Sequence, residues 1–592
     1  MNPSPSERTS LSPVPSLQRG KACLACRRRK MRCDGVRPVC GQCVRGSRVD
    51  DCEYTDGQRR SRTQTLEEDI VRLRARVQEL EHPEQETPMV PLYDPYQQAQ
   101  SSAALSSRSL HLSGHSSNAS SPGTSSAESL AMYTLTGGIP DAIATWWTLK
   151  IPPHHILQTA LETFMPYAVE FGLFLDYHRF SQAALENTVT RTVPPVLLNT
   201  IILWYLQVSR SEELFALETT ILPRVSQQLA EAMTCISSQT MLYVLQAEVF
   251  LGYFFLRKGR PLEARYHCSA AVTLAVGYRL HIGPDAPQTE SMFNDLFPAA
   301  MEISSPVDLV EESERIDAFW TIFTLDRTSS VILNTPPNLY TGTSGVQITV
   351  PWPLAVPSQE NGGVVQDDTL VDFFSGSQAV ASEDLSMLAL QAQAAALLER
   401  AGSMARQYNS VPRITENIEW LGQFTTLDNL IDRFLSLLPP IDHAENRSSS
   451  SNYRRLLAIH TFSAISTIQL HHIFRSSHAP SNEKSIAAAR TIASVLDKVN
   501  TRGLGYFNPA MATSWVAATF VLNGELTRLK AIKASWATVG LNGAPGGEVS
   551  EGEAELESAL RKILAALDDL ALNCPRRDFW KKFGALLLLF NA

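Results

Sequence analysis

Six of the nine cysteines in this 592-residue chain lie between positions 23 and 52, and this cluster limits the possible folds of that segment severely. The spacing is C-x2-C-x6-C-x6-C-x2-C-x8-C. The residues are Cys23, Cys26, Cys33, Cys40, Cys43 and Cys52. A segment of about 30 residues cannot bury enough apolar surface to form a core of its own. It therefore needs cross-links or metal ions to fold.

The rest of the sequence favours metal ligation over disulfide bonding. Residues 1–20 have no apolar core and do not resemble a secretory signal. No apolar run is long enough to span a membrane, so we expect no membrane association. These features indicate a reducing compartment, where clustered cysteines are typically metal ligands. The other three cysteines, Cys235, Cys268 and Cys574, lie scattered in apolar surroundings.

The number of cysteines predicts how many ions they bind. Six thiolates give two zinc ions four ligands each only if two sulfurs are shared. The two halves of the cluster are near copies, each with a C-x2-C pair and then a third cysteine after six or eight residues. A RING-type fold would need eight ligands and usually a histidine, and no histidine falls in this segment. A metallothionein-like sink would not need an ordered basic run. The pattern therefore predicts a binuclear centre with two zinc ions per chain.

The segment CLACRRRKMRCDGVRPVCGQC, which begins at Cys23, resembles the fungal zinc binuclear cluster family of transcription factors. The family's proline two residues before the fourth cysteine is present as Pro38. The resemblance implies a particular ligand arrangement: Cys23 and Cys40 bridge the two ions, Cys26 and Cys33 complete one site, and Cys43 and Cys52 complete the other. It also implies sequence-specific binding of double-stranded DNA in the nucleus.

A run of cations fills most of the gap between the second and third cysteines. These residues are Arg27, Arg28, Arg29, Lys30 and Arg32. On a short helix they would meet a duplex, where some side chains bind phosphate and others reach base edges. The resemblance implies that Lys30 contacts a guanine pair in a CGG-type triplet, while Arg29 and Arg32 contact phosphate. A solvated charge run or a nuclear-import signal is the alternative interpretation, and these roles can coexist with DNA binding.

The charge of the chain is distributed unevenly. Residues 19–62 contain 13 Lys or Arg and 5 Asp or Glu, whereas the net charge of the whole chain is -9. A segment of net charge +8 therefore stands beside a remainder of net charge -17. Only the basic segment is expected to meet phosphate.

A short amphipathic helix is predicted after a basic connector. Its apolar positions, which alternate at spacings of four and three, are Leu66, Ile70, Leu73, Val77 and Leu80. This is the a/d pattern of a two-stranded coiled coil, and Pro83 ends it. The helix is short enough to be marginal alone. We expect a homodimer, because pairing two three-base half-sites raises specificity.

The patterns divide the chain into six segments. They are a disordered N-terminus (1–20), a binuclear zinc cluster DNA-binding domain (21–53), a basic linker (54–65), a coiled-coil dimerisation helix (66–81), a Ser-rich disordered linker (82–138) and a large all-α regulatory domain (139–592). Residues 101–130 contain 13 serines, so this part of the linker cannot bury enough apolar surface to offset its ordering entropy.

The large domain shows helical periodicity and no βαβ alternation. We expect buried helix faces within 241–254, 270–278 and 556–570, and loops at 356–383, 444–452 and 540–551. The segment EESERIDAFWTIFTLDRTSSVILNTPPNL, residues 311–339, resembles the helical middle homology region of the same family, and the resemblance extends over roughly residues 145–350. Within it, Asp326 and Arg327 are expected to form a buried or capping ion pair.

An acidic and aromatic stretch, residues 367–374, has two interpretations. It could be a loop that binds coactivators. The favoured interpretation is the start of a helix that packs its phenylalanines inward.

The sequence contains no pattern typical of an enzyme. GxSxG, HExxH and P-loop motifs are absent, and the neighbouring pairs His154-His155 and His471-His472 point about 100° apart on a helix. Six cysteines would saturate two zinc ions and leave no position for a reactive water. We therefore predict a transcription regulator of the RNA polymerase II type that controls a metabolic or biosynthetic gene set. The alternative is a ligand-sensing protein whose zinc segment is mainly structural or targeting.

Overall fold

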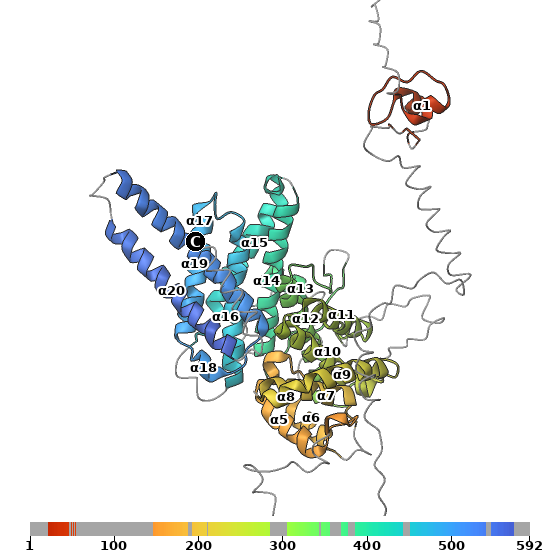
Figure 1. Ribbon diagram of the computed structural model, residues 1–592, viewed down its shortest axis with the longest axis vertical. Helices are drawn as coiled ribbons and strands as arrows, with labels where there is room; N and C mark the ends of the chain where they lie inside the picture. The colour runs from red at the N-terminus through yellow and green to blue at the C-terminus, as the bar shows by residue number, and fades with distance from the viewer. Residues whose placement is uncertain are drawn as a thin grey trace, which may run out of the picture. The chain divides into compact units, whose positions relative to one another are not determined.

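The computed structural model in Figure 1 divides the chain into two compact units, Met1–Met132 and Tyr133–Ala592. The structure describes residues 22–46, 49, 51, 52, 54, 146–186, 192–209, 211–283, 305–341, 345–355, 369–376, 385–411, 413–441, 450–539 and 546–572. The N-terminus 1–20, the predicted coiled-coil helix with its apolar positions, and most of both predicted linkers lie outside the described residues. Their structures stay predictions.

The described part of the first unit holds two short helices, α1 (Leu24–Arg28) and α2 (Gly41–Arg45). Each helix begins directly after the first cysteine of a C-x2-C pair. We call this part the cysteine module, residues 22–54. Five cysteine side chains are its buried apolar groups, and small partly buried side chains such as Ala22 and Ala25 pack around them.

The second unit, which we call the helical body, is built from helices. Its described residues contain no strand, only one isolated antiparallel bridge between Leu354 and Leu385. The helices are η1 (Trp146–Thr148), α5 (His154–Ala168), η2 (Val169–Phe171), α6 (Tyr177–Leu185), α7 (Pro195–Val208), α8 (Glu212–Ala216), α9 (Glu218–Met233), α10 (Ser238–Lys258), α11 (Pro261–Gly277), α12 (Leu309–Ile332), α13 (Thr369–Ser375), α14 (Met387–Ser410), η3 (Ile414–Glu416), α15 (Ile418–Leu437), α16 (Ser450–His472), α17 (Ala479–Asp497), α18 (Thr501–Leu504), α19 (Pro509–Val539) and α20 (Gly546–Leu572).

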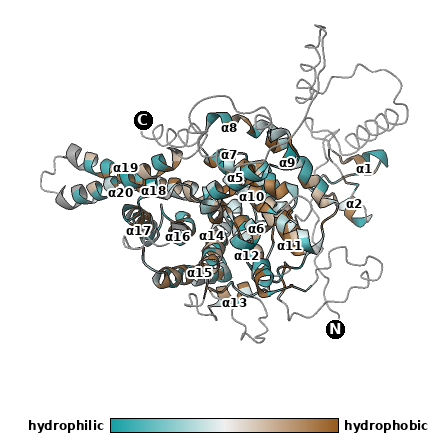
Figure 2. Ribbon diagram, turned by 90° about the horizontal axis from the view of Figure 1, so that it is seen from below, coloured by the Kyte–Doolittle hydropathy of each residue, from teal (hydrophilic) through white to brown (hydrophobic). Residues whose placement is uncertain are grey.

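The helices pack in pairs around one continuous apolar core. α10 packs on α11, α14 on α16, and α19 on α20, where the two long helices form the hairpin drawn in blue in Figure 1. Figure 2 shows hydrophobic and hydrophilic stretches alternating along these helices, as expected when one face is buried. The ring of Trp204 stacks on Phe171 at 4.0 Å and on Phe164 at 5.3 Å near the centre of the core.

The predicted buried face is confirmed for α10, for α11 except at Ala270, and only in part for α20. Met241, Leu245 and Phe254 are all buried in α10. In α20 the buried line runs through Leu556, Ala559, Ile563 and Ala566, while the predicted large residues Leu560, Leu564, Leu567 and Leu570 are only half-buried.

The predicted loops are shorter than expected, because helices begin inside them. α13 forms within 356–383, α16 already begins at Ser450, and α20 begins at Gly546. In α13 the side chain of Phe373 is buried, which agrees with the favoured interpretation of this stretch as a helix that packs inward. Asp367 and Asp368 lie outside the described residues.

The prediction that Asp326 and Arg327 form an ion pair with each other is wrong. Both side chains are buried, but each binds the segment that follows α12 instead of the other. Asp326 accepts hydrogen bonds from the backbone N–H groups of Asn338 (2.9 Å) and Leu339 (3.0 Å). Arg327 donates to the Leu339 carbonyl at 2.9 Å. Successive residues on a helix point in different directions, which explains why they do not pair.

Candidate metal centre and nucleic-acid interface

Two cysteines begin the two helices of the cysteine module. Cys23 is the N-cap of α1, and its Sγ accepts a hydrogen bond from the Cys26 backbone N–H at 3.4 Å. Cys40 is the N-cap of α2 and accepts from the Cys43 N–H at 3.4 Å. Capping by a side-chain acceptor satisfies an orphan donor of the first turn. The same hydrogen bonds hold the two sulfurs of each C-x2-C pair on one side of the helix start.

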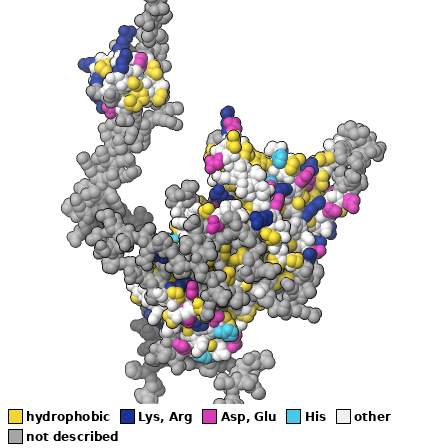
Figure 3. Space-filling view, turned by 180° about the vertical axis from the view of Figure 1, so that it is seen from behind, with side chains coloured by type: hydrophobic (Ala, Val, Ile, Leu, Met, Phe, Trp, Pro, Cys, Tyr) yellow, Lys and Arg dark blue, Asp and Glu magenta, His cyan; other side chains and the backbone are white. Residues whose placement is uncertain are grey.

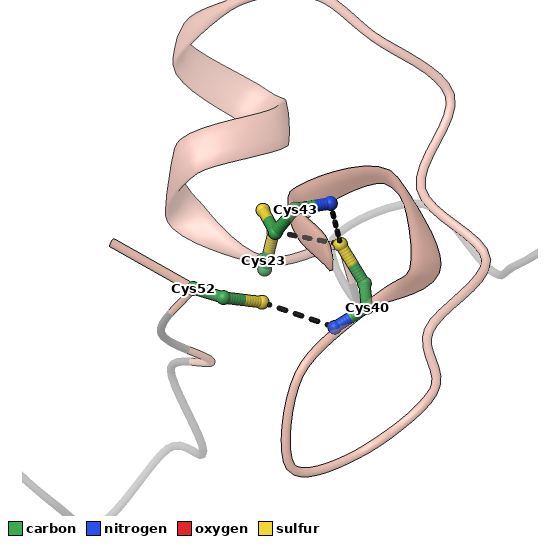
Figure 4. Close-up of side chains that lie close together, drawn as sticks. All are labelled: Cys23, Cys40, Cys43 and Cys52. Atoms are coloured by element: carbon green, nitrogen blue, oxygen red, sulfur yellow. Dashed lines mark hydrogen bonds between the residues drawn. The ribbon is translucent and has the colours of Figure 1, made fainter. Parts of the chain in front are cut away.

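The six predicted ligands come together as two overlapping groups of four sulfurs. One group contains Cys23, Cys26, Cys33 and Cys40, and the other contains Cys23, Cys40, Cys43 and Cys52. Within each group the sulfur atoms lie within 4.8 Å of one another. Figure 4 shows the second group, with the Cys52 sulfur accepting from the Cys40 backbone N–H at 3.2 Å. Cys23 and Cys40 are the two members that both groups share.

The distances between sulfurs fit zinc coordination. Cys23 Sγ lies 3.7 Å from Cys40 Sγ and 3.8 Å from Cys43 Sγ, and Cys26 Sγ lies 3.7 Å from Cys40 Sγ. A tetrahedral ion with zinc–sulfur bonds of about 2.3 Å places its sulfurs about 3.8 Å apart. A disulfide would need about 2.0 Å, and all six thiols are free. Two tetrahedra that share an edge therefore match the arrangement.

Burial makes three of these thiols poor anions unless a cation is present. Burial raises the pKa of Cys23 and Cys26, and it raises that of Cys43 to about 12. Burial also acts to raise the pKa of Cys40, but the Cys43 backbone N–H and neighbouring thiols outweigh it and lower the pKa to about 6. A bound divalent ion displaces thiol protons, so zinc binding by this group competes with acid.

Two residues outside the cysteine set brace the module, and the sequence reading missed both. Asp34 accepts a hydrogen bond from the Gly41 N–H at 2.9 Å and thereby fixes the start of α2. A Cβ on Gly41 would come within 2.5 Å of that carboxylate, so a larger residue there would displace the Asp34 side chain. Tyr54 donates to the Val36 carbonyl at 3.0 Å and lies 3.7 Å from Cys33 Sγ. An acid next to a ligand cysteine followed by glycine is the signal that could have indicated the first contact.

The predicted DNA-binding residues share an exposed surface at the end of α1. Arg27, Arg28, Arg29, Lys30 and Arg32 are all exposed. Figure 3 shows the Lys and Arg side chains gathered on one side of the module.

Lys30 has a special backbone conformation within this run. It lies in the left-handed region with φ 52°, and the following N–H, that of Met31, donates to the Cys26 carbonyl at 2.9 Å. This is the end of a helix of the Schellman type, where glycine is the usual residue. A lysine there accepts backbone strain, which points to a role for its side chain.

The helical body contains an arrangement that resembles a hydrolase triad but cannot act as one. His471 Nε2 lies 2.9 Å from Asp428 Oδ1, and His471 Nδ1 lies 3.1 Å from Ser481 Oγ. Ser481 is only 2% exposed, so its hydroxyl cannot reach a substrate. The three residues instead join α15, α16 and α17. Of the three scattered cysteines, Cys268 is buried, Cys235 is exposed, contrary to its expected apolar surroundings, and Cys574 lies outside the described residues.

No described helix has the length and apolar composition needed to cross a bilayer.

Two family models match the chain. The model of the Fungal Zn(2)-Cys(6) binuclear cluster domain matches residues 21–61. The model of the Fungal specific transcription factor domain matches residues 163–486, which is more than half of the chain. No curated protein and no solved structure matches it. Cluster domains of this kind hold two zinc ions with six cysteines, so the predicted cofactor, two zinc ions per chain, is confirmed. Neither model describes an enzyme.

Proposed function

The chain belongs to the fungal-specific transcription factors that carry a Zn(2)-Cys(6) binuclear cluster, and we propose that it reads CGG-like triplets of nuclear DNA through the cysteine module. The observation that carries this proposal is the exposed basic surface at the end of α1, with Lys30 held in a strained conformation at its centre. A major-groove guanine offers two acceptors to such a cation.

The proposed ligand roles follow the overlap of the two sulfur groups. Cys23 and Cys40 bridge both ions, Cys26 and Cys33 complete the first, and Cys43 and Cys52 complete the second. Replacing Cys40 with serine should release both ions, whereas Cys26→Ser should release one ion first. Zinc content per chain, measured by mass spectrometry, tests the roles. A content of one ion in the unmodified protein would exclude shared sulfurs.

We propose that one of these cations recognises base identity, whereas the others mainly increase binding affinity. Lys30 contacts a base edge, while Arg29 and Arg32 bind phosphate and Arg27 and Arg28 extend the same basic surface. Losing a base contact typically costs about 1–3 kcal/mol and relaxes preference at one base pair. Losing a phosphate contact weakens binding to all sequences and lowers the salt slope by about one.

The test compares three variants of the full chain on a randomised duplex pool at two salt concentrations. Lys30→Ala should flatten the preference at one base pair, and Arg32→Ala should weaken binding evenly. Arg45→Ala is the matched control, because Arg45 is an exposed cation of the other helix that donates to its own Gly41 carbonyl at 3.2 Å. If Lys30→Ala keeps the full triplet preference, another group reads the bases. If the unmodified chain shows no base preference at all, the structural or targeting alternative for the zinc module is favoured.

We also propose that the protein binds DNA as a homodimer through the seam Leu66, Ile70, Leu73, Val77 and Leu80. Charged residues at both Ile70 and Val77 would remove the apolar seam. Binding to paired triplets should then fall far more than binding to a single triplet. Equal loss on both duplexes would exclude this seam as the dimer contact.

Regulation of a metabolic or biosynthetic gene set is the expected role in the cell. The measurement that tests it is the set of genomic positions that the chain occupies, compared with expression changes after its deletion.

A further inference from the structure

The chain leaves the cysteine module at Tyr54, which is the last residue that the structure describes before position 146. Two residues earlier the chain is held at Cys52, whose sulfur accepts a hydrogen bond from the Cys40 backbone N–H at 3.2 Å. The predicted basic linker continues after Tyr54 to residue 65, and the predicted seam begins at Leu66. The contacts of Tyr54 therefore decide where the linker starts.

Three contacts join Tyr54 to the part of the module between Cys33 and Cys40. Its hydroxyl donates to the Val36 carbonyl at 3.0 Å, across 18 residues of sequence, and lies 3.7 Å from Cys33 Sγ. The guanidinium of Arg37 lies over the tyrosine ring, 4.8 Å from its centroid. The side chain is half-buried and packs against the cluster of buried cysteines. Tyr54 thus ties the end of the module to a loop that comes much earlier in the chain.

The loop that binds Tyr54 is itself held in place. Asp34 accepts hydrogen bonds from the backbone N–H groups of Val36 at 3.3 Å and Gly41 at 2.9 Å. Cys33 and Cys40, on either side of the loop, belong to the groups of sulfurs that fit zinc. Because the loop is fixed at both ends, a side chain bound to it has a fixed position within the module.

The metal centre does not require residue 54. Each group of four sulfurs is complete with Cys52 as its last member in the sequence. Without the tyrosine contacts, the last fixed residue would be Cys52, and residues 53–65 would join the module to the seam. With these contacts, only residues 55–65 do so.

We propose that Tyr54 is a positioning residue that determines which separation between two DNA triplets the protein prefers. This inference rests on the proposed homodimer, in which two modules bind two triplets while the seam joins the chains. Tyr54 does not contact DNA in this proposal. It acts by fixing the start of the linker relative to the basic surface at the end of α1.

The length of two residues is large compared with one step of the duplex. Releasing residues 53 and 54 adds up to about 7 Å of reach to each module. One more base pair between the triplets moves the second triplet by about 3.4 Å along the axis and turns it by about 35°. A dimer with both tyrosines released could therefore follow a change of spacing that the tied dimer cannot follow.

The experiment selects duplexes with the zinc-loaded full chain. The pool contains pairs of CGG triplets in every relative orientation, at every spacing up to about two helical turns. Tyr54→Phe removes the hydroxyl bond to Val36 and keeps the ring beside Arg37. It should lower the preference for the best spacing over its neighbours by about two- to tenfold, as expected for one hydrogen bond. Tyr54→Ala, which also removes the ring, should lower it further.

Two further measurements separate positioning from stability. Zinc content and affinity for a duplex with a single triplet should be unchanged in Tyr54→Phe. Val49→Ala is the matched control, because its side chain is 52% exposed and lies in the same segment before Cys52, and it should keep the spacing preference. If Tyr54→Ala loses zinc, Tyr54→Phe alone decides.

An unchanged spacing preference in Tyr54→Phe would overturn the inference. A loss of zinc or of single-triplet affinity in Tyr54→Phe, without a broader range of spacings, would overturn it too, because the tyrosine would then only support the fold. A gain on paired triplets without any preferred spacing in the unmodified chain would contradict this inference and leave the homodimer standing. The absence of any gain on paired triplets would overturn the homodimer and this inference with it.

Discussion

The cysteine module buries five cysteines and little else, whereas the helical body buries a continuous core of aromatic and aliphatic side chains. In the module the organising contacts run through sulfur, and the surface left outside is basic. In the body they run through rings such as Trp204 and Phe171, and the unusual groups are charges inside. The difference predicts which change unfolds each unit. The module should unfold when its metal is removed, and the body should lose stability when its packing or its interior charge is changed.

The largest difference between the two units should follow removal of zinc. Structural zinc contributes about 10–16 kcal/mol to small zinc domains near neutral pH, so a strong chelator should unfold the module and abolish DNA binding. The body should keep its melting transition, because its described residues hold no comparable cysteine group. Circular dichroism and DNA binding, followed during chelation, check this. Loss of both units at one chelator concentration would contradict their independence.

The converse change targets the core of the body. Trp204 is fully buried and donates from Nε1 to the Phe250 carbonyl at 3.2 Å. Trp204→Ala should destabilise the body by about 3–5 kcal/mol. Zinc content should remain at two ions per chain. Phe520→Ala, at a ring that is 44% exposed, is the control and should cost little. Denaturant unfolding monitors both variants.

A fall in pH should weaken zinc binding by the module but stabilise the folded body. In the module, protons compete with zinc for thiolates, so zinc affinity falls as the pH falls. In the body, burial raises the pKa of Glu170 from 4.5 to about 7. The folded state then binds more protons than the unfolded state between those values, so this residue's contribution is full below about pH 4.5 and is lost as the pH rises through 7.

The variant Glu170→Gln isolates the contribution of Glu170 to the pH dependence of stability. Between pH 5 and pH 8, the stability of the unmodified body should fall relative to Glu170→Gln by roughly 3 kcal/mol at most. Chemical unfolding at several pH values gives the difference. A difference that stays constant with pH would show that Glu170 has the same pKa in both states.

The smallest effect concerns the strained lysine. Lys30→Gly should relieve the left-handed backbone and leave the module as stable or more stable by up to about 1 kcal/mol, while preference at one base pair is lost. Zinc competition measures the first effect, and selection from a duplex pool measures the second. A variant that binds zinc more weakly would show that the lysine side chain supports the fold.

The cysteine spacing predicted the metal centre well because ligand number and geometry leave few solutions for six thiols. It did not predict Asp34 or Tyr54, since these residues act through contacts that form only once the loop between Cys33 and Cys40 has folded. In the body, periodicity predicted the buried face of α10 but favoured large residues over the alanines in α20.

The overlap of the two sulfur groups has a consequence for metal supply. In the proposed arrangement each ion depends on Cys23 and Cys40, which also cap α1 and α2. The first ion to bind orders both helix starts and so prepares most of the second site. Loading is then cooperative, and at limiting zinc the population consists mainly of full and empty modules, with few half-filled ones. The fraction of protein competent to bind DNA should respond to zinc more steeply than independent sites would allow.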